Sequence, residues 1–204
     1  MKTAVEKIGK PRRALNPPPW LATLAALAGA ATLSAQVVVD TVTGGPSESS
    51  PNTSYGYVDG PTAAAAKFNY PLGLALGSDP SARAVLYVAD RDNNAIRKLD
   101  LSLGVTITFL PNDVVPASVI AYPVGVAVDG VGSLYVLNRG NGNNGTVLTF
   151  DPYGNPLRTN AAALINANGI ALDSLANIYV TVEGNKVKRI TPAGAVTTAY
   201  HRRH

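Results

Sequence analysis

The chain has 204 residues, which fits one domain with or without short tails, and 46% of them are hydrophobic, enough for a substantial core. Only 15% are charged, while 19 are glycine and 15 are proline, and this composition favours a turn-rich β protein over a helical one. Cysteine is absent, which excludes disulfide bonds and a cysteine nucleophile.

The net charge of +4 comes from the first 35 residues, which hold five of the 17 basic and one of the 13 acidic residues. The rest of the chain has 12 residues of each sign. Its basic residues are scattered and do not form the stripe of lysine, arginine and aromatic side chains that nucleic acid requires. We therefore expect no nucleic-acid partner.

Residues 1–35 have the layout of a secretory signal peptide. Five basic residues come first, the apolar run Trp20–Leu33 follows, and Leu33-Ser34-Ala35 offers small residues for cleavage before Gln36. The alternative is an uncleaved membrane anchor, but a spanning helix needs about 20 apolar residues. We therefore expect cleavage after Ala35, a secreted or periplasmic protein, and no membrane span once the signal is removed.

The next segments are predicted from weak patterns. Residues 36–45 alternate between apolar and polar side chains and end in Gly-Gly, which predicts a lone N-terminal strand. Residues 46–70 are mostly polar and are expected to form a long connecting loop, a length that is usually functional or disordered.

Three similar stretches follow at residues 71–110, 123–160 and 167–200. Each contains short apolar runs separated by turn residues, which predicts a four-stranded antiparallel sheet. The landmark residues Tyr87, Tyr135 and Tyr179 are 48 and 44 residues apart. A period in the forties with four strands per repeat is typical of a β-propeller, so we predict an all-β fold of about three blades plus one extra N-terminal strand.

The best-preserved copy, Tyr57 to Asp100, resembles the NHL repeat of bacterial exported six-bladed propellers. The resemblance rests on GYVDGPTAAAAKFNYPLGLAL, on LYVADRDNNAIRKLD, and on the motif Asp90-x-x-Asn93 followed by Ile96-Arg97-Lys98. Later copies depart from this motif, since Asn138 replaces the acidic residue and a turn insertion follows it. The resemblance implies that the lone strand is the outer strand of a preceding blade.

The number of blades raises a question, because a closed propeller has 4–8 of them. We expect this chain to be the N-terminal part of a longer propeller. The alternative is that two chains meet in one six-bladed ring. In either case the ring of a single chain is incomplete, and its open blade edges are expected to favour self-association.

The sequence offers little for catalysis. Histidine occurs only at His201 and His204, in a tail predicted to be disordered (residues 201–204), so a Ser-His-acid triad inside the fold is excluded. Asn168-Gly169-Ile170 resembles a segment of the gluconolactonase/regucalcin family, which implies that Asn168 faces the channel and helps to hold calcium or another divalent metal. The alternative is a polar residue that opens an inner strand. Our main interpretation includes no cofactor.

Loops at one end of the strands provide a candidate binding face, because loops on a rigid scaffold often carry function. Its predicted members precede the inner strands or follow the second strands of the blades: Tyr70, Arg91, Asp92, Tyr122, Arg139, Asn141 and Glu183. We interpret the chain as a non-enzymatic module for protein or glycan binding, or as a scaffold. The alternatives are part of a metal-dependent hydrolase, purely structural repeats, and, for these loops, an ordinary solvated surface.

Overall fold

The structure is a computed structural model of the chain, and it describes residues 40–44, 55–61, 65–111 and 120–200. The predicted signal peptide, residues 36–39 of the predicted N-terminal strand and the predicted tail lie outside these ranges. The chain divides into residues 1–39 and residues 40–204, and the second unit holds all the described residues. Within the described ranges, no helix has the length and hydrophobicity needed to cross a membrane.

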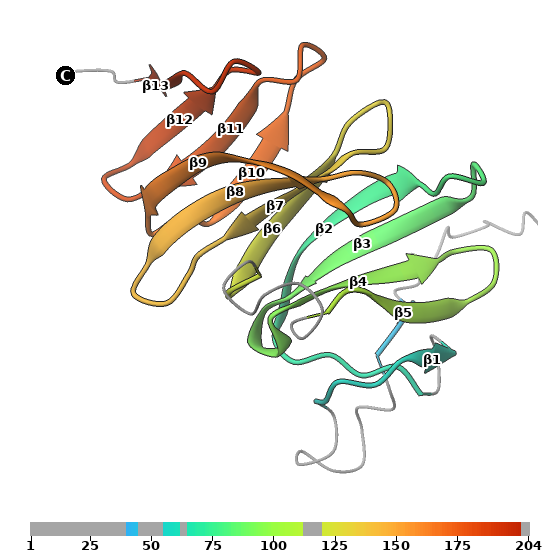
Figure 1. Cartoon of the computed structure of the whole chain (residues 1–204). Helices are drawn as coiled ribbons and strands as arrows, with labels where there is room; N and C mark the ends of the chain where they lie inside the picture. The colour runs from blue at the N-terminus through green and yellow to red at the C-terminus, as the bar shows by residue number, and fades with distance from the viewer. Residues whose placement is uncertain (1–39, 45–54, 62–64, 112–119, 201–204) are drawn as a thin grey trace, which may run out of the picture. The chain divides into compact units, whose positions relative to one another are not determined.

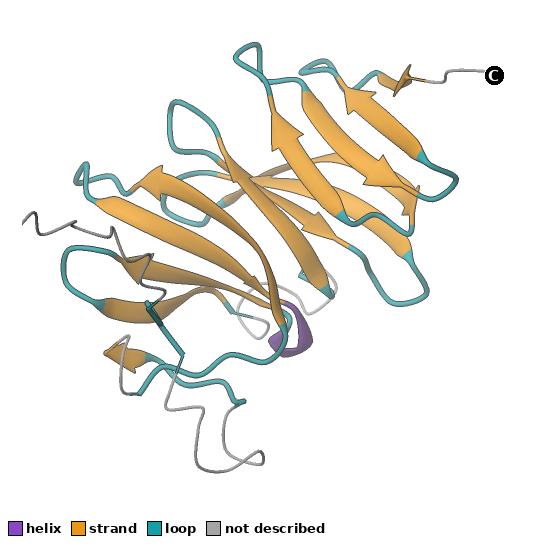
Figure 2. Cartoon of the chain, turned by 180° about the vertical axis from the view of Figure 1, so that it is seen from behind, coloured by secondary structure: helices purple, strands orange, loops and turns teal. Residues whose placement is uncertain are grey.

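The described chain folds into three antiparallel sheets, each built from strands that are consecutive in sequence (Figure 1). The first sheet has the order β1-β5-β4-β3-β2, with β1 at Gly60–Pro61, β2 at Pro71–Ser78, β3 at Ala84–Asp90, β4 at Ala95–Asp100 and β5 at Val105–Leu110. The second has β6 at Pro123–Val128, β7 at Leu134–Asn138, β8 at Asn144–Phe150 and β9 at Pro156–Ile165. The third has β10 at Gly169–Leu172, β11 at Ile178–Val182, β12 at Lys186–Ile190 and β13 at Val196–Tyr200. The all-β prediction of three four-stranded repeats is confirmed, and the only described helix is the 3₁₀ turn η1, Arg91–Asn93 (Figure 2).

The extra strand is not where the sequence pattern placed it. The described part of the predicted N-terminal strand, residues 40–44, is not in strand conformation, although Thr43 Oγ1 lies 3.0 Å from Thr106 Oγ1 of β5. The fifth strand of the first sheet is β1, from the segment predicted as a loop, and it pairs antiparallel with β5. Pro61 fits this edge position because an edge strand leaves one side of its backbone unpaired. Strand β9 continues to Ile165, beyond the predicted end of the second blade at residue 160.

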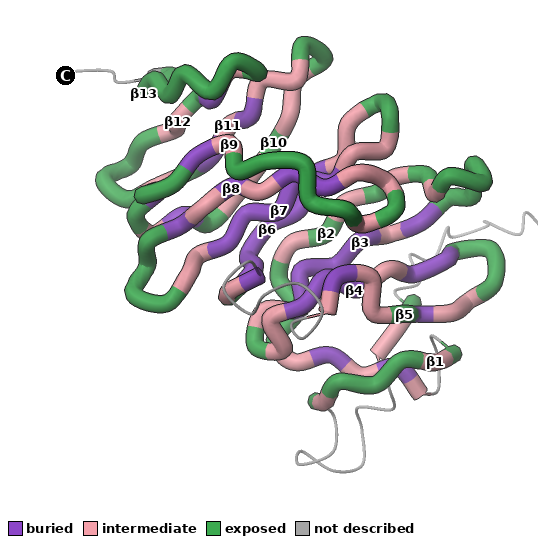
Figure 3. The backbone as a smooth tube through the Cα atoms, in the orientation of Figure 1, coloured by how far each residue is buried: buried purple, intermediate pink, exposed green. Residues whose placement is uncertain are grey.

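Adjacent sheets pack through their inner strands, with β2 beside β6 and β6 beside β10 (Figure 1). The backbones approach closely: a Cβ atom on Gly73 would lie 2.6 Å from Gly125 Cα. Two apolar clusters form the core, one between the first and second sheets and one between the second and third. Buried residues are concentrated in β3, β4 and β6–β8, while most turns are exposed (Figure 3). The three sheets therefore form one stack of blades with small residues at the innermost strands.

The repeated tyrosines fill the space between blades, but their hydroxyl groups differ. The Tyr135 hydroxyl donates to Asp129 Oδ2 at 3.3 Å, and the Tyr179 hydroxyl donates to Asp173 Oδ2 at 3.2 Å. Tyr87 is fully buried, and its hydroxyl has no hydrogen-bond partner among the described residues. The first blade has Gly77 at the position of these aspartates. Our expectation of a solvated or bonded hydroxyl is therefore wrong for Tyr87, because the acceptor is missing from that blade.

One turn recurs at the other end of the strands. An Asp or Thr side-chain oxygen accepts the backbone N–H four residues later, and the residue between them, third after the Asp or Thr, has a positive φ. The five copies begin at Asp79, Asp129, Asp151, Asp173 and Thr191. These side chains satisfy backbone donors that would otherwise be unpaired in a tight turn. The turn thus fixes the hairpins that follow β2, β6, β8, β10 and β12.

These turns predict a loss of stability in acid. The side-chain amide of Asn155 and nearby backbone N–H groups hold the pKa of Asp151 below its ordinary value, and Asn177 has the same effect on Asp173. Because the folded state binds these protons less readily than the unfolded state, the stabilisation is complete above the unfolded pKa of about 3.9 and is lost as pH falls through the lower folded values. Urea unfolding of the double variant Asp151→Asn and Asp173→Asn should show a flatter dependence on pH below about 5 than the unmodified chain. Identical slopes would contradict this assignment.

Candidate binding face

The loops before the inner strands share an unusual backbone conformation. Tyr70, Tyr122 and Asn166 precede β2, β6 and β10, and their φ angles are 57°, 47° and 51°. Non-glycine residues rarely adopt positive φ, and such positions persist only where the surroundings fix them. Here the loop after the second strand of each blade supplies the fixing contacts, which are Asp92 N to Asn69 O at 3.0 Å, Arg139 N to Tyr122 O at 2.9 Å and Glu183 N to Ile165 O at 2.9 Å. The same loop pair is thus built three times at one end of the sheets.

The first loop pair forms a compact group of three predicted residues. The Arg91 guanidinium lies 4.0 Å above the centre of the Tyr70 ring, and its Nε donates to Asp92 Oδ1 at 2.7 Å. The hydrogen bond from Arg91 to Asp92, with the nearby tyrosines Tyr70 and Tyr122, raises the pKa of Arg91 above its ordinary value. Arg91 is therefore a fixed positive charge stacked on an aromatic residue that is itself 59% exposed.

A polar relay joins the second and third blades. Arg139 Nε donates to Asn143 Oδ1 at 2.8 Å, and its Nη2 donates to Asn166 Oδ1 at 3.3 Å. Asn166 Nδ2 in turn donates to Glu183 Oε2 at 3.0 Å. The relay connects to the first blade, since the Tyr122 N–H donates to Asn94 Oδ1 at 2.8 Å. The asparagines hold the two charged side chains apart and at a defined spacing.

These groups surround a pocket of about 350 Å³, within the size range of ligand sites. Its lining residues come from the loops of the first two blades: Arg91, Tyr122, Arg139, Gly140, Asn141, Gly142 and Asn143. Four predicted residues therefore line one pocket, Tyr70 and Asp92 contact it through Arg91, and Glu183 connects through Asn166. We name these seven predicted residues with Asn143 and Asn166 the binding face.

The sequence prediction missed Asn143 and Asn166. Asn166 corresponds to Tyr70 and Tyr122 in the repeat, but its side chain gives no hint of that equivalence, because the shared property is the positive φ. The signal that was available is the residue type, since asparagine adopts this conformation more readily than most residues.

A larger hollow of about 560 Å³ lies at the other end of the sheets, between the turns that follow β2, β6 and β8. Its carboxylates, Asp79 and Asp129, already accept hydrogen bonds from the backbone of their own turns. These groups serve the hairpins, so this hollow offers fewer uncommitted polar groups than the binding face.

The predicted metal ligand Asn168 is an exposed residue at the start of β10, and its backbone N–H donates to Thr181 O at 3.1 Å. Across the described parts of the chain, no three His, Cys, Asp or Glu residues are grouped so that they could hold a metal ion. The metal role of Asn168 stays a prediction.

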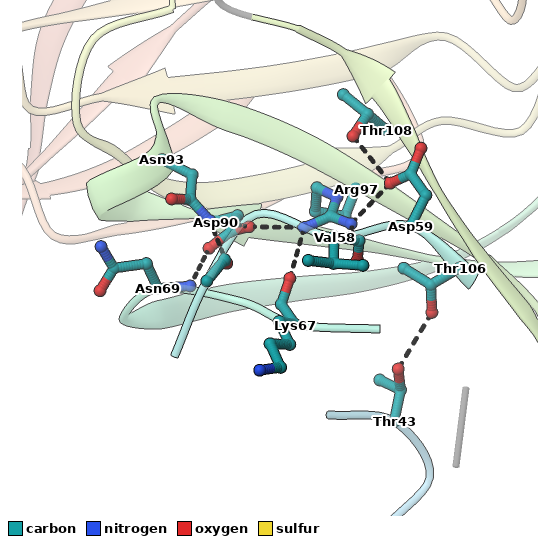
Figure 4. A network of polar contacts seen from close by, with 11 residues as sticks. Thr43, Val58, Asp59, Lys67, Asn69, Asp90, Asn93, Arg97, Thr106 and Thr108 are labelled. Atoms are coloured by element: carbon teal, nitrogen blue, oxygen red, sulfur yellow. Dashed lines mark hydrogen bonds and ion pairs between the residues drawn. The ribbon is translucent and has the colours of Figure 1, made fainter. Parts of the chain in front are cut away.

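The Asp90, Asn93 and Arg97 motif forms a buried network rather than a ligand site (Figure 4). Arg97 and Asp90 are both fully buried, and Arg97 Nη1 lies 2.9 Å from Asp90 Oδ2. The other acceptors of the guanidinium come from residues 55–69: Lys67 O and Val58 O, each at 2.8 Å, and Asp59 Oδ1 at 2.6 Å. Arg97 thus clamps this segment onto the face of the first blade.

Asp90 completes the clamp. It accepts hydrogen bonds from the Asn69 backbone N–H at 2.7 Å and from Asn93 Nδ2 at 2.8 Å. Burial raises the pKa of Asp90, and these two donors together with Arg97 oppose that effect. The Arg97 guanidinium also lies over the rings of Tyr57 and Phe68, 5.1 and 5.0 Å from their centres. Because Asn69 is held here, the next residue, Tyr70, enters the binding face from a fixed point.

No protein-family model matches the chain, and no curated protein matches it either. Solved structures do share its fold at low sequence identity. A nidogen/laminin complex is 21% identical with a TM-score of 0.53, over 64% of this chain and 48% of that one. A structure described as a putative phosphatase, from Bacteroides thetaiotaomicron, is 19% identical with a TM-score of 0.53, over 76% and 36%. An aldose sugar dehydrogenase from Streptomyces coelicolor, with bound PQQ, is 18% identical with a TM-score of 0.50, over 78% and 48%.

Together with the three meandering sheets, these similarities define the class of protein: the chain is part of a β-propeller. It spans less than half the length of each of these three structures. At such identities the similarity shows the fold alone, and the structures differ widely in what they do. The relation to the NHL repeat therefore stays a resemblance.

Proposed function

We propose that the chain is an exported propeller module that binds a protein partner through the binding face, without catalysis of its own. The observation that carries this proposal is the joint lining of one pocket by Arg91, Tyr122 and Arg139. Tyrosine and arginine are among the residues that most often dominate binding energy at protein interfaces. Tyr70 and Tyr122 are 59% and 41% exposed although the backbone that holds them is fixed, so little order has to be gained on binding.

A structural neighbour supports the choice of a protein over a glycan. The nidogen/laminin structure is a complex between proteins, so a chain with a similar fold takes part in a protein–protein assembly there. The mixed charges of the face also favour a protein, since Arg91 and Arg139 alternate with Asp92 and Glu183. Such alternation gives orientation and specificity to a complementary polar surface.

The test replaces both arginines in the double variant Arg91→Ala and Arg139→Ala. With the chain immobilised as bait for the exported proteins of its source organism, we expect at least a tenfold loss of the captured partner. Each good arginine contact at an interface centre is worth about 1–2 kcal/mol or more, and about 1.4 kcal/mol corresponds to a factor of ten. Quantitative mass spectrometry of the captured proteins measures the change.

The matched control is Arg83→Ala with Arg158→Ala, which removes the same charge from two exposed arginines at the other end of the strands. It should capture the partner as the unmodified chain does. Equal capture by both double variants would remove the arginines from the site. Binding to a glycan array without any protein capture would overturn the choice of partner, and a calcium-dependent rise in melting temperature would instead favour the metal-dependent alternative.

A further inference from the structure

One face of the first blade exposes leucines on the innermost strand. Leu74 and Leu76 of β2 are 64% and 67% exposed, whereas Ala75 and Gly77 between them face β6. Residues alternate across a strand, so the leucines share the face that points away from the second blade. Apolar side chains aligned in this way usually mark a contact surface. We call Leu72, Leu74 and Leu76 the leucine face.

The chain itself shows what covers such a face. By the repeat, Leu74 and Leu76 correspond to Val126 and Val128 of β6. Val126 is only 5% exposed, and it belongs to the same apolar cluster as Ala75 of the first blade. A Cβ atom on Gly77 would lie 3.0 Å from Val128 Cγ1. The partner of these valines is thus a surface of small residues on the neighbouring blade.

The third blade exposes that partner surface. Ala171 of β10 corresponds to Ala75, and it is exposed. Beside it, Tyr179 corresponds to Tyr87 and Tyr135, which are 0% and 4% exposed because the next blade covers them. Tyr179 itself remains half-buried. We call the surface formed by Gly169, Ala171 and Tyr179 the alanine face.

We propose that a second copy of the chain covers these faces, with the leucine face of each copy packed on the alanine face of the other. The described chain already makes this type of contact twice, between its first and second blades and between its second and third. Three blades from each of two copies give six, which lies within the range of closed propellers. The contact is heterologous, and two such contacts close the pair.

Engineered cysteines test the geometry, and the absence of native cysteine makes the readout clean. The variant with both Leu74→Cys and Ala171→Cys should form a covalent dimer under mild oxidation, because the corresponding pair, Val126 and Ala75, lies in one cluster. Either single variant should stay uncrosslinked, since a heterologous contact never brings two copies of the same residue together. A ladder of larger species, or crosslinking of a single variant, would overturn the closed pair.

Light scattering on the unmodified chain provides the second readout. We expect twice the monomer mass, and at least a tenfold rise in the concentration needed for dimerisation in Leu74→Asp. The matched control is Leu157→Asp, in which an exposed leucine of β9 on the middle blade is changed and the mass should not move.

A monomer at the highest soluble concentration would overturn the proposal. So would a monomeric Leu74→Cys variant whose introduced thiol resists a thiol reagent, because another part of the same chain would then cover the leucine face. The proposal does not depend on the binding face, and the double variant Arg91→Ala and Arg139→Ala should still dimerise.

Discussion

Replacing Arg97 with methionine is expected to lower the free energy of unfolding by about 3–5 kcal/mol. The guanidinium is fully buried and ties Asp90 to Val58 and Lys67 through three hydrogen bonds of 2.8–2.9 Å. Methionine fills a similar volume, so the loss comes mainly from an acidic group left buried without its cation and from backbone carbonyls left without a donor. Urea unfolding, followed by circular dichroism, measures the change.

Arg83→Met is the control for this prediction. The Arg83 side chain is 51% exposed and lies 3.7 Å from Asp100 Oδ2, so its loss should cost less than about 1 kcal/mol. The additional change Asp90→Leu in the Arg97→Met background should recover part of the lost stability, since it removes the unpaired acid. Equal losses for Arg97→Met and Arg83→Met would show that the buried network does not hold residues 55–69 in place.

Gly73→Ala should destabilise the contact between the first and second blades by about 1–3 kcal/mol. The added Cβ would lie 2.6 Å from Gly125 Cα and 2.8 Å from Val124 O. Both neighbours are backbone atoms of β6, so the clash cannot be relieved by rotating a side chain. The two inner strands must separate instead, which also weakens the apolar cluster between the two sheets.

The control is Gly130→Ala, in a turn where an added Cβ would have no atom within 4 Å. Its free energy of unfolding should stay within about 0.5 kcal/mol of that of the unmodified chain. Thermal and urea unfolding of both variants, compared at equal protein concentration, separate the effect of the clash from the general effect of removing a glycine. A tolerated Gly73→Ala would mean that the inner strands are not in contact in solution.

The sequence predicted the strands well because their determinants are local. Apolar runs, the recurring Tyr87, Tyr135 and Tyr179, and the turn aspartates repeat with the period of the blade and mark the hairpins directly. Strand β1 was missed because Gly60 and Pro61 carry no apolar pattern. They form a strand only because β5 offers an unpaired edge, and that edge exists only in the folded blade.

The binding face was predicted in part for the same reason. Tyr70, Arg91, Tyr122 and Arg139 could be placed together from the order of strands and loops alone. Their connections could not, since Asn166 joins Arg139 to Glu183 through a side-chain orientation set by tertiary contacts. The Arg97 motif was recognised, but its acceptors are backbone carbonyls of a segment read as a loop, and a carbonyl leaves no trace in residue type.

The Arg97 clamp also imposes an order of events on the growing chain. Synthesis runs from the N-terminus, so Val58 emerges first and its carbonyl waits for a donor that lies 39 residues further on. The interval to the Lys67 carbonyl is 30 residues. Closing loops of this size costs entropy that the hydrogen bonds must offset. Residues 55–69 are therefore expected to dock late, once β3 and β4 have paired, and the arrival of Arg97 marks the moment at which the first blade can assemble cooperatively.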